Sequence, residues 1–202
     1  MRTRHVAVTV LISMVVFLFG CAGSNKYMKP AASGQDDPAS FKLGEGEAGI
    51  VFMRPSTFGY KISSSVFEIS ENDETFAGIV SARKKVFYKT SAGEHLFMVI
   101  GESADFMKAS LMAGKMYYAL VTPRMGAMKA RFSLKPVTKS ELTSEQFKTW
   151  EKDCELTENT PESFNWAKKN SGSIKAKRAK YWPVWDGKAD IDKPILQEED
   201  CL

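Results

Sequence analysis

Short apolar or alternating runs recur about every ten residues between positions 49 and 137, with glycine, asparagine or aspartate between them. This spacing is typical of an all-β protein whose strands are joined by short hairpin turns. In the clearest run, from residue 128 to 135, apolar residues alternate with lysine, arginine and serine. Such a strand has one face on the core and one face in water.

Two further runs, at residues 95–100 and 117–121, are apolar at almost every position and are expected in the middle of a sheet. We predict strands near residues 49–54, 64–70, 74–81, 84–91, 94–101, 105–112, 115–122 and 127–136. The expected fold class is therefore mainly β, an antiparallel β-sandwich of about eight strands with a short helical C-terminal appendage.

The pattern changes to that of helices after Val137. Thr143 and Gln146 have the spacing of a capping box. A second helix is expected at Thr160, where proline and glutamate follow in the first turn. A third is expected to begin after Ser173 and to end before Pro183, because a proline ring opposes helix continuation.

The N terminus has two arginines, Arg2 and Arg4, followed by an apolar stretch over residues 6–19 and then by Gly20 and Cys21. The sequence Phe-Leu-Phe-Gly-Cys at 17–21 resembles the lipobox of bacterial lipoprotein signal peptides. This resemblance implies removal of residues 1–20 and lipidation of Cys21. It places the protein in the bacterial cell envelope, anchored by lipid to the outer membrane and facing the periplasm.

Three other interpretations of the N terminus compete with a lipoprotein signal. A membrane-spanning helix needs about 20 apolar residues, and this stretch is shorter. Ordinary secretion with cleavage after Ala22 stays open, because Phe19 is bulky for a lipobox. A core helix is disfavoured, since the stretch is apolar on every side rather than along one stripe.

The expected organisation has four parts. They are a signal peptide (1–20), a lipidated flexible tether (21–47), a β-sandwich domain (48–137) and a helical C-terminal extension (138–202). The formal net charge of the whole chain is +4, and removal of Arg2 and Arg4 with the signal peptide lowers it to +2. Charge of this size does not indicate a polyanionic partner, and we expect no nucleic acid.

Lipidation of Cys21 would leave two cysteines, Cys154 and Cys201. An oxidising compartment permits a disulfide between them. The alternative is a buried thiol at Cys154, which lies at helical spacing from Phe147 and Trp150, with Cys201 on a loose end. The sequence leaves both readings open.

Three segments together resemble a family of uncharacterised bacterial lipoproteins. They are Gly49–Pro55, Ala92–His95 and Ala113–Tyr118. The family's shared domain is a DUF-type, transthyretin-like or PEGA-like β-sandwich, and Ala92 stands where the family has proline in the turn before a core strand. The resemblance implies a sandwich over residues 48–137 and brings no catalytic residue.

Residue chemistry also gives little support for an enzyme. His5 is lost with the signal peptide, so His95 is the only remaining imidazole. It follows a glycine turn at the start of an apolar strand, which favours a hydrogen-bonded structural histidine over a general base. No set of nucleophile, base and orienting acid can be assembled. We predict a non-enzyme with no cofactor and no metal site.

A basic, aromatic-flanked stretch lies in the predicted extension. Its residues are Lys168, Lys169, Lys175, Lys177, Arg178, Lys180, Trp182 and Trp185. This stretch could contact a partner protein or anionic lipid. The alternative is a solvated helix whose aromatic side chains pack on the sandwich.

These observations favour a docking or accessory module that binds another envelope protein. A module that binds cell-wall glycan or a small ligand is the second hypothesis, with Trp166, Trp182 and Trp185 available to stack on sugar rings. A hydrolase ranks third.

Overall fold

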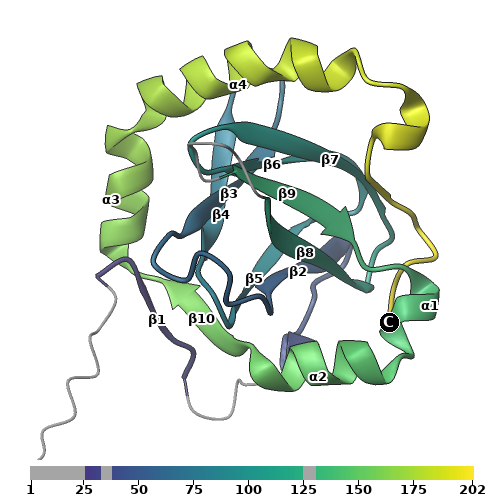
Figure 1. The fold of residues 1–202 in the computed structure, drawn as a ribbon. Helices are drawn as coiled ribbons and strands as arrows, with labels where there is room; N and C mark the ends of the chain where they lie inside the picture. Colours follow the sequence, from purple (N-terminus) through teal and green to yellow (C-terminus); the bar gives the residue numbers. More distant parts are fainter. Residues whose placement is uncertain (1–25, 33–37, 125–130) are drawn as a thin grey trace, which may run out of the picture.

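The computed structural model describes residues 26–32, 38–124 and 131–202. This part of the chain is mainly β, with eleven strands in two mixed sheets and four α-helices around them (Figure 1). The prediction of a mainly β fold with helices toward the C terminus is therefore confirmed. Within these residues no helix is both long enough and apolar enough to cross a membrane.

The first sheet has six strands. In spatial order they are β1 (Met28–Pro30), β10 (Glu155–Asn159), β5 (Lys84–Ser91), β2 (Glu47–Arg54), β8 (Met116–Arg124) and β9 (Arg131–Pro136). The second sheet has five strands. In spatial order they are β11 (Ile195–Leu196), β7 (Ala104–Leu111), β6 (Gly93–Ile100), β3 (Ser64–Ile69) and β4 (Glu74–Val80).

The eight predicted strands correspond to β2 through β9. Only the last differs by more than two residues at its start, because β9 begins at Arg131 and residues 127–130 lie outside the described part of the chain. The predicted antiparallel arrangement is wrong for three neighbouring pairs, since β2 with β8, β10 with β5 and β11 with β7 are parallel. The members of these pairs are far apart in sequence, so no hairpin turn fixes their relative direction.

Inward-facing side chains from both sheets form one hydrophobic core. Phe52 of β2 meets Phe97 of β6 with ring centroids 5.2 Å apart. Because side chains alternate along a strand, Val51 and Tyr118 point to the other face of the six-stranded sheet and form a second cluster with Phe147. Both faces of this sheet are therefore covered, as is usual for parallel strands.

Four helices cover the outer faces of the two sheets. They are α1 (Lys139–Leu142), α2 (Glu145–Asp153), α3 (Pro161–Lys169) and α4 (Ser171–Asp186). The first two lie against the six-stranded sheet, and α3 and α4 lie along the five-stranded sheet (Figure 1). Two short 3-10 helices, at Pro38–Ser40 and Asp190–Asp192, complete the described structure.

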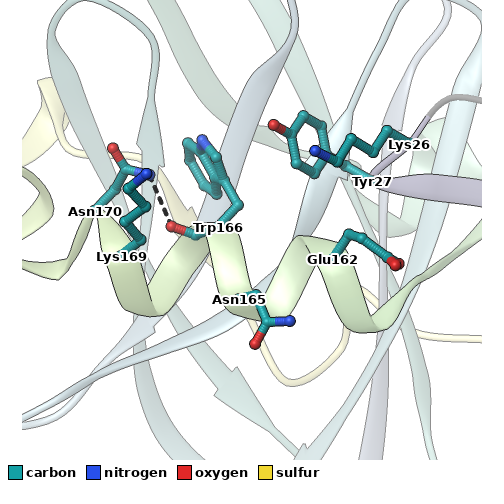
Figure 2. Close-up of a pocket in the computed structure, with 7 residues that line it drawn as sticks. All are labelled: Lys26, Tyr27, Glu162, Asn165, Trp166, Lys169 and Asn170. Carbon is teal, nitrogen blue, oxygen red and sulfur yellow. Dashed lines mark hydrogen bonds between the residues drawn. The ribbon is translucent and has the colours of Figure 1, made fainter.

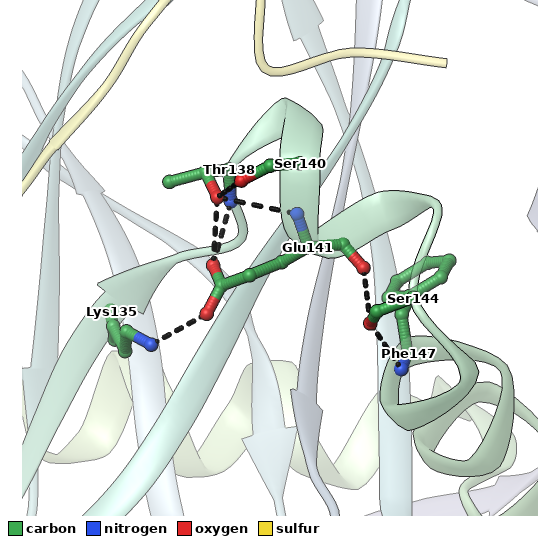
Figure 3. A network of polar contacts seen from close by, with 6 residues as sticks. All are labelled: Lys135, Thr138, Ser140, Glu141, Ser144 and Phe147. Atoms are coloured by element: carbon green, nitrogen blue, oxygen red, sulfur yellow. Dashed lines mark hydrogen bonds and ion pairs between the residues drawn. The ribbon is translucent and has the colours of Figure 1, made fainter.

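Helix starts differ from the predictions in detail (Figure 3). The capping box is formed by Thr138 and Glu141 at α1, whereas the predicted residue Thr143 ends that helix. Ser144 caps α2 by accepting from the Phe147 amide at 3.1 Å. Both starts use a hydroxyl to satisfy an amide that has no partner inside the helix.

The other two helices confirm one prediction and correct another. Thr160 caps α3, and Pro161 follows in its first turn as predicted. The helix α4 continues through Pro183 to Asp186 instead of ending before the proline. Trp182 and Trp185 lie on either side of Pro183 and both pack on Phe106. This packing offsets the backbone hydrogen bond that proline removes.

The ranges predicted as tether and as helical extension both contribute strands. Met28 lies in the tether range, yet it is buried and pairs with Asn159 through β1 and β10. The Thr160 hydroxyl donates to the Lys26 carbonyl at 2.9 Å. The chain is therefore attached to the fold at Lys26 and along β1, and Lys26 lies five positions after Cys21.

Candidate functional site

The connection from β2 to β3, residues 55–63, presents an apolar surface. Phe58, Tyr60 and Ile62 are 54%, 67% and 45% exposed. Single exposed apolar residues are ordinary on a protein surface, but here three lie within five positions of one loop, which makes the loop a candidate for binding. We call residues 55–63 the docking loop.

Arg54 holds the docking loop from beneath. Its side chain is fully buried, and its Nη1 donates to the Ile62 carbonyl at 2.5 Å. Its Nη2 donates to the carbonyls of Phe58 at 2.6 Å and Gly59 at 3.0 Å. The guanidinium also lies 4.9 Å from the centre of the Phe132 ring. One buried cation thus fixes three points of the loop backbone.

Burial lowers the pKa of Arg54, because the charged guanidinium loses water when it enters the protein. The loop carbonyls replace part of that hydration. Gly59 has φ of +64°, a left-handed conformation that glycine adopts without strain. Hydrogen bonds within the chain therefore hold the backbone of this loop. The sequence offered no signal for this, since Arg54 reads as the polar end of a strand.

A surface pocket of about 440 Å³ lies between α3 and the segment that enters β1 (Figure 2). Its lining residues are Lys26, Tyr27, Glu162, Asn165, Trp166, Lys169 and Asn170. The Tyr27 and Trp166 rings are 6.4 Å apart and tilted by 57°. The Asn170 amide donates to the Trp166 carbonyl at 2.8 Å. Aromatic faces beside amides and charges suit a small polar ligand.

The predicted basic surface is divided by the structure. Four of its lysines are exposed: Lys168, Lys169, Lys175 and Lys180. Lys177 instead turns to the sheet and donates to the Gly101 carbonyl at 2.6 Å. Arg178 pairs with Glu74 at 2.9 Å and donates to the Ser70 carbonyl. These last two side chains attach α4 to the five-stranded sheet.

The tryptophans of the same stretch pack inward. Trp185 is only 1% exposed, and its ring lies 5.3 Å from that of Trp182. Both rings contact Phe106 of β7, at 5.9 Å and 5.2 Å. The burial of Trp185 corrects its assignment to a partner surface and agrees with the alternative, in which these aromatic side chains pack on the sheet. Trp182 packs on the sheet but remains partly exposed, as does Trp166.

The two cysteines are free and are not joined. Cys154 belongs to the cluster with Tyr118 and Phe147 on the outer face of the six-stranded sheet. Cys201 pairs with Tyr117 through an isolated β-bridge and packs against the core on the other face. Since Tyr117 and Tyr118 point to opposite sides of β8, the sheet separates the two thiols. The disulfide considered from the sequence is therefore not formed.

His95 takes part in a polar network that joins the two sheets. Its Nδ1 lies 2.5 Å from Oε1 of Glu68, and its Nε2 donates to the Ser91 carbonyl at 2.9 Å. Tyr88 and Thr90 of the other sheet donate their hydroxyls to the same carboxylate, at 2.6 Å and 3.1 Å. Both ring nitrogens are thus engaged within the protein, as expected for a structural histidine.

The charges of this network stabilise one another. The hydrogen bond to Glu68 raises the pKa of His95 despite the opposing effect of burial. Burial alone would raise the pKa of Glu68, but hydrogen bonds from His95 and Tyr88 outweigh it, and the pKa is lowered. Burial and the Glu68 carboxylate raise the pKa of Tyr88. The arrangement favours an imidazolium–carboxylate pair.

Cys21, the predicted lipidation site, lies outside the described residues. No protein-family model matches the chain, and no curated protein sequence matches it.

Proposed function

We propose that this chain is a lipid-anchored β-sandwich protein of the bacterial envelope that binds another envelope protein and catalyses no reaction. The signal peptide over residues 1–20 would be removed and Cys21 lipidated, so that the folded part lies in the periplasm at the outer membrane. The observation that carries the proposal is the exposed apolar docking loop, fixed by the buried Arg54.

The shape of the docking loop supports binding to a protein. A loop that is already ordered loses less conformational entropy on association, so more of its apolar contact contributes to affinity. Phe58 and Tyr60 are aromatic, and aromatic side chains dominate the binding energy of many interfaces. Lys61 lies between Tyr60 and Ile62. The partner we propose is an envelope protein with an apolar groove bordered by acidic residues.

The attachment of the N terminus supports a position close to the membrane. Lys26 is fixed to Thr160 and lies only five positions after Cys21. A fully extended segment of that length reaches about 17 Å. The tether between lipid and fold is therefore much shorter than the range 21–47 suggested. This arrangement suits a module that binds a partner at the membrane surface.

We also propose that the chain belongs to the family of bacterial lipoproteins with transthyretin-like or PEGA-like domains. Gly49–Arg54 lies in β2, Ala92–His95 spans the β5–β6 turn, and Ala113–Tyr118 leads into β8. The three segments that carry the resemblance thus meet in core strands and their turns. This placement supports the relationship through fold alone.

The second candidate function is binding of a glycan or small polar ligand in the pocket of Figure 2. Trp166 and Tyr27 offer ring faces, and Asn165 and Glu162 offer hydrogen-bonding groups. This pocket favours the alternative more than the tryptophans of α4 do, since Trp185 is buried.

Site-specific crosslinking in cells tests the docking proposal. A photoreactive amino acid replaces Phe58, and a control chain carries it at Lys148, an exposed position on α2. We expect one recurrent envelope protein to be captured from position 58 and not from position 148. The captured protein, once purified, should bind the chain directly, and Phe58→Ser with Tyr60→Ser should abolish binding.

A Cys21→Ser chain provides the control for the anchor. Loss of the crosslink in this form, with retained binding between the purified proteins, would establish that the lipid serves only to bring the partners together. Equal capture from positions 58 and 148 would overturn the docking proposal. Recovery of cell-wall fragments that depends on Trp166 would instead support the second candidate.

A further inference from the structure

A second pocket, of about 220 Å³, lies where α4 meets the ends of β7, β8 and β9. Its polar lining is formed by Ser103, Asp105, Arg124, Arg131, Trp185 and Lys188. The pocket is separate from the docking loop and from the pocket at α3. We call it the α4 pocket.

Positive charge exceeds negative charge around the α4 pocket. Asp105 is the only acidic side chain among its described lining residues. Both of its oxygens are engaged, one by Lys188 at 3.3 Å and the other by Arg124 at 3.4 Å. Arg131 forms no ion pair within the described part of the chain. Arg124 and Lys188 therefore share the carboxylate of Asp105, and Arg131 has no carboxylate partner among the described residues.

The placement of the two arginines is unfavourable by itself. Arg124 and Arg131 are directly opposite each other in the antiparallel pair of β8 and β9. Like charges in opposite positions of neighbouring strands repel and destabilise a sheet. An anion bound between the two guanidinium groups would turn this repulsion into attraction, because arginine pairs bind carboxylate and phosphate oxygens in a forked geometry.

Two buried donors line the same pocket. The Ser103 hydroxyl and the Trp185 indole N–H find no hydrogen-bond partner among the described residues. Ser103 is 7% exposed and Trp185 is 1% exposed, so neither is well solvated. Leaving such a donor unpaired costs about 1–3 kcal/mol.

We propose that the α4 pocket binds a small organic anion through a carboxylate or phosphate group. Arg124 and Arg131 hold the anionic oxygens, and Ser103 supplies a further hydrogen bond. Tyr181 and Val184 provide an apolar wall for the rest of the molecule. Both arginines are exposed, so water screens part of their repulsion, whereas an anion that accepts from both guanidinium groups would also neutralise their charge. The volume equals that of about seven liquid water molecules, enough for a compact ligand.

The test follows the indole N–H signal of Trp185 by NMR in the full lipidated chain, held in detergent micelles. The probes are inorganic phosphate and benzoate, each added against chloride at constant ionic strength. We expect a saturable shift with at least one probe, with dissociation in the range of about 1 mM or below. Arg131→Gln should weaken that binding by about tenfold or more, since each charge-assisted hydrogen bond has that effect.

A matched control separates specific binding from general charge. Lys148→Gln removes the same charge from exposed α2 and should leave the binding unchanged. Arg131→Gln should keep the fold, because no ion pair within the described chain is lost, and its melting temperature should equal that of the parent or exceed it. Affinity and stability therefore report on different properties of this variant.

A third probe identifies the source of the anion. Micelles containing phosphatidylglycerol are compared with micelles containing phosphatidylcholine. A Trp185 shift that requires phosphatidylglycerol and Arg131 would identify a lipid headgroup, whereas a shift with the soluble probes would identify a free anion. The proposal is overturned if none of the three probes shifts the signal up to about 10 mM, or if Arg131→Gln leaves every shift unchanged.

Discussion

The imidazole of His95 and the carboxylate of Glu68 form a pair between β6 and β3, with Nδ1 and Oε1 2.5 Å apart. Tyr88 of β5 donates to the same carboxylate, so the pair also connects the two sheets. The hydrogen bond to Glu68 raises the pKa of His95, and hydrogen bonds from His95 and Tyr88 lower the pKa of Glu68, so the stability of the fold depends on pH.

His95→Gln should lower the free energy of unfolding by about 2 kcal/mol near pH 5.5. A histidine whose pKa is raised on folding stabilises fully below its unfolded value of 6.5, and this contribution is lost as pH rises through the folded value. A glutamate with a lowered pKa stabilises above 4.5 and loses its contribution as pH falls. The difference between parent and variant should therefore be largest between these two values and smaller at pH 9.

Denaturant unfolding of both proteins at pH 5.5 and pH 9 measures this difference. Lys148→Gln serves as a control for the general effect of charge, because the ion pair of Lys148 with Glu145 is exposed. A cost of the His95 substitution that is the same at both pH values would show that the pair carries no ionic contribution.

Arg54→Met should free the docking loop and destabilise the protein by about 3 kcal/mol or more, because three loop carbonyls lose their donor. Methionine retains most of the apolar contact of the arginine stem. Hydrogen exchange of the amides in residues 55–63 should become faster, while exchange in β6 should change little. Arg83→Met is the matched comparison. The ion pair of Arg83 with Asp153 is half exposed, so its loss should lower the free energy of unfolding by less than about 1 kcal/mol.

Trp185→Ala should cost about 3–5 kcal/mol, since the ring is buried against Trp182 and Phe106. The adjacent residue Val184 is 68% exposed, and Val184→Ala should change stability by less than about 0.5 kcal/mol. Thermal unfolding of the two variants distinguishes inward packing of this segment from exposure on a partner surface, for which both costs would be small.

The mature protein should contain two free thiols without reduction, and they should differ in reactivity. Burial raises the pKa of Cys154 to about 11, so little thiolate is present at pH 8. Cys201 is only partly buried and should react first with iodoacetamide. Mass spectrometry of the alkylated, unreduced protein measures both quantities. A mass two hydrogens lower with no alkylation would establish the disulfide that the structure lacks.

The sequence by itself determined which segments become strands. Periodic apolar runs located β2 to β9, since burial of one face or both faces of a strand leaves a local pattern. The polar turn before residue 74 joins the antiparallel pair of β3 and β4, as its composition indicated. The glycine-bearing links at 92–94 and 113–115 instead lead from one sheet to the other, so the hairpins expected there are wrong. The Thr160–Pro161 start of α3 was equally local, because a capping hydroxyl and the amide it binds are three residues apart.

Only the tertiary structure decided how distant segments combine. The parallel pairing of β2 with β8 and the insertion of β10 between β1 and β5 depend on contacts between residues far apart in the chain. The role of Arg54 under the docking loop and the burial of Trp185 have the same origin. A sequence pattern records whether a side chain is apolar or charged. It does not record which distant part of the chain will pack over that side chain. This packing determines which residues remain on the surface and can bind a partner.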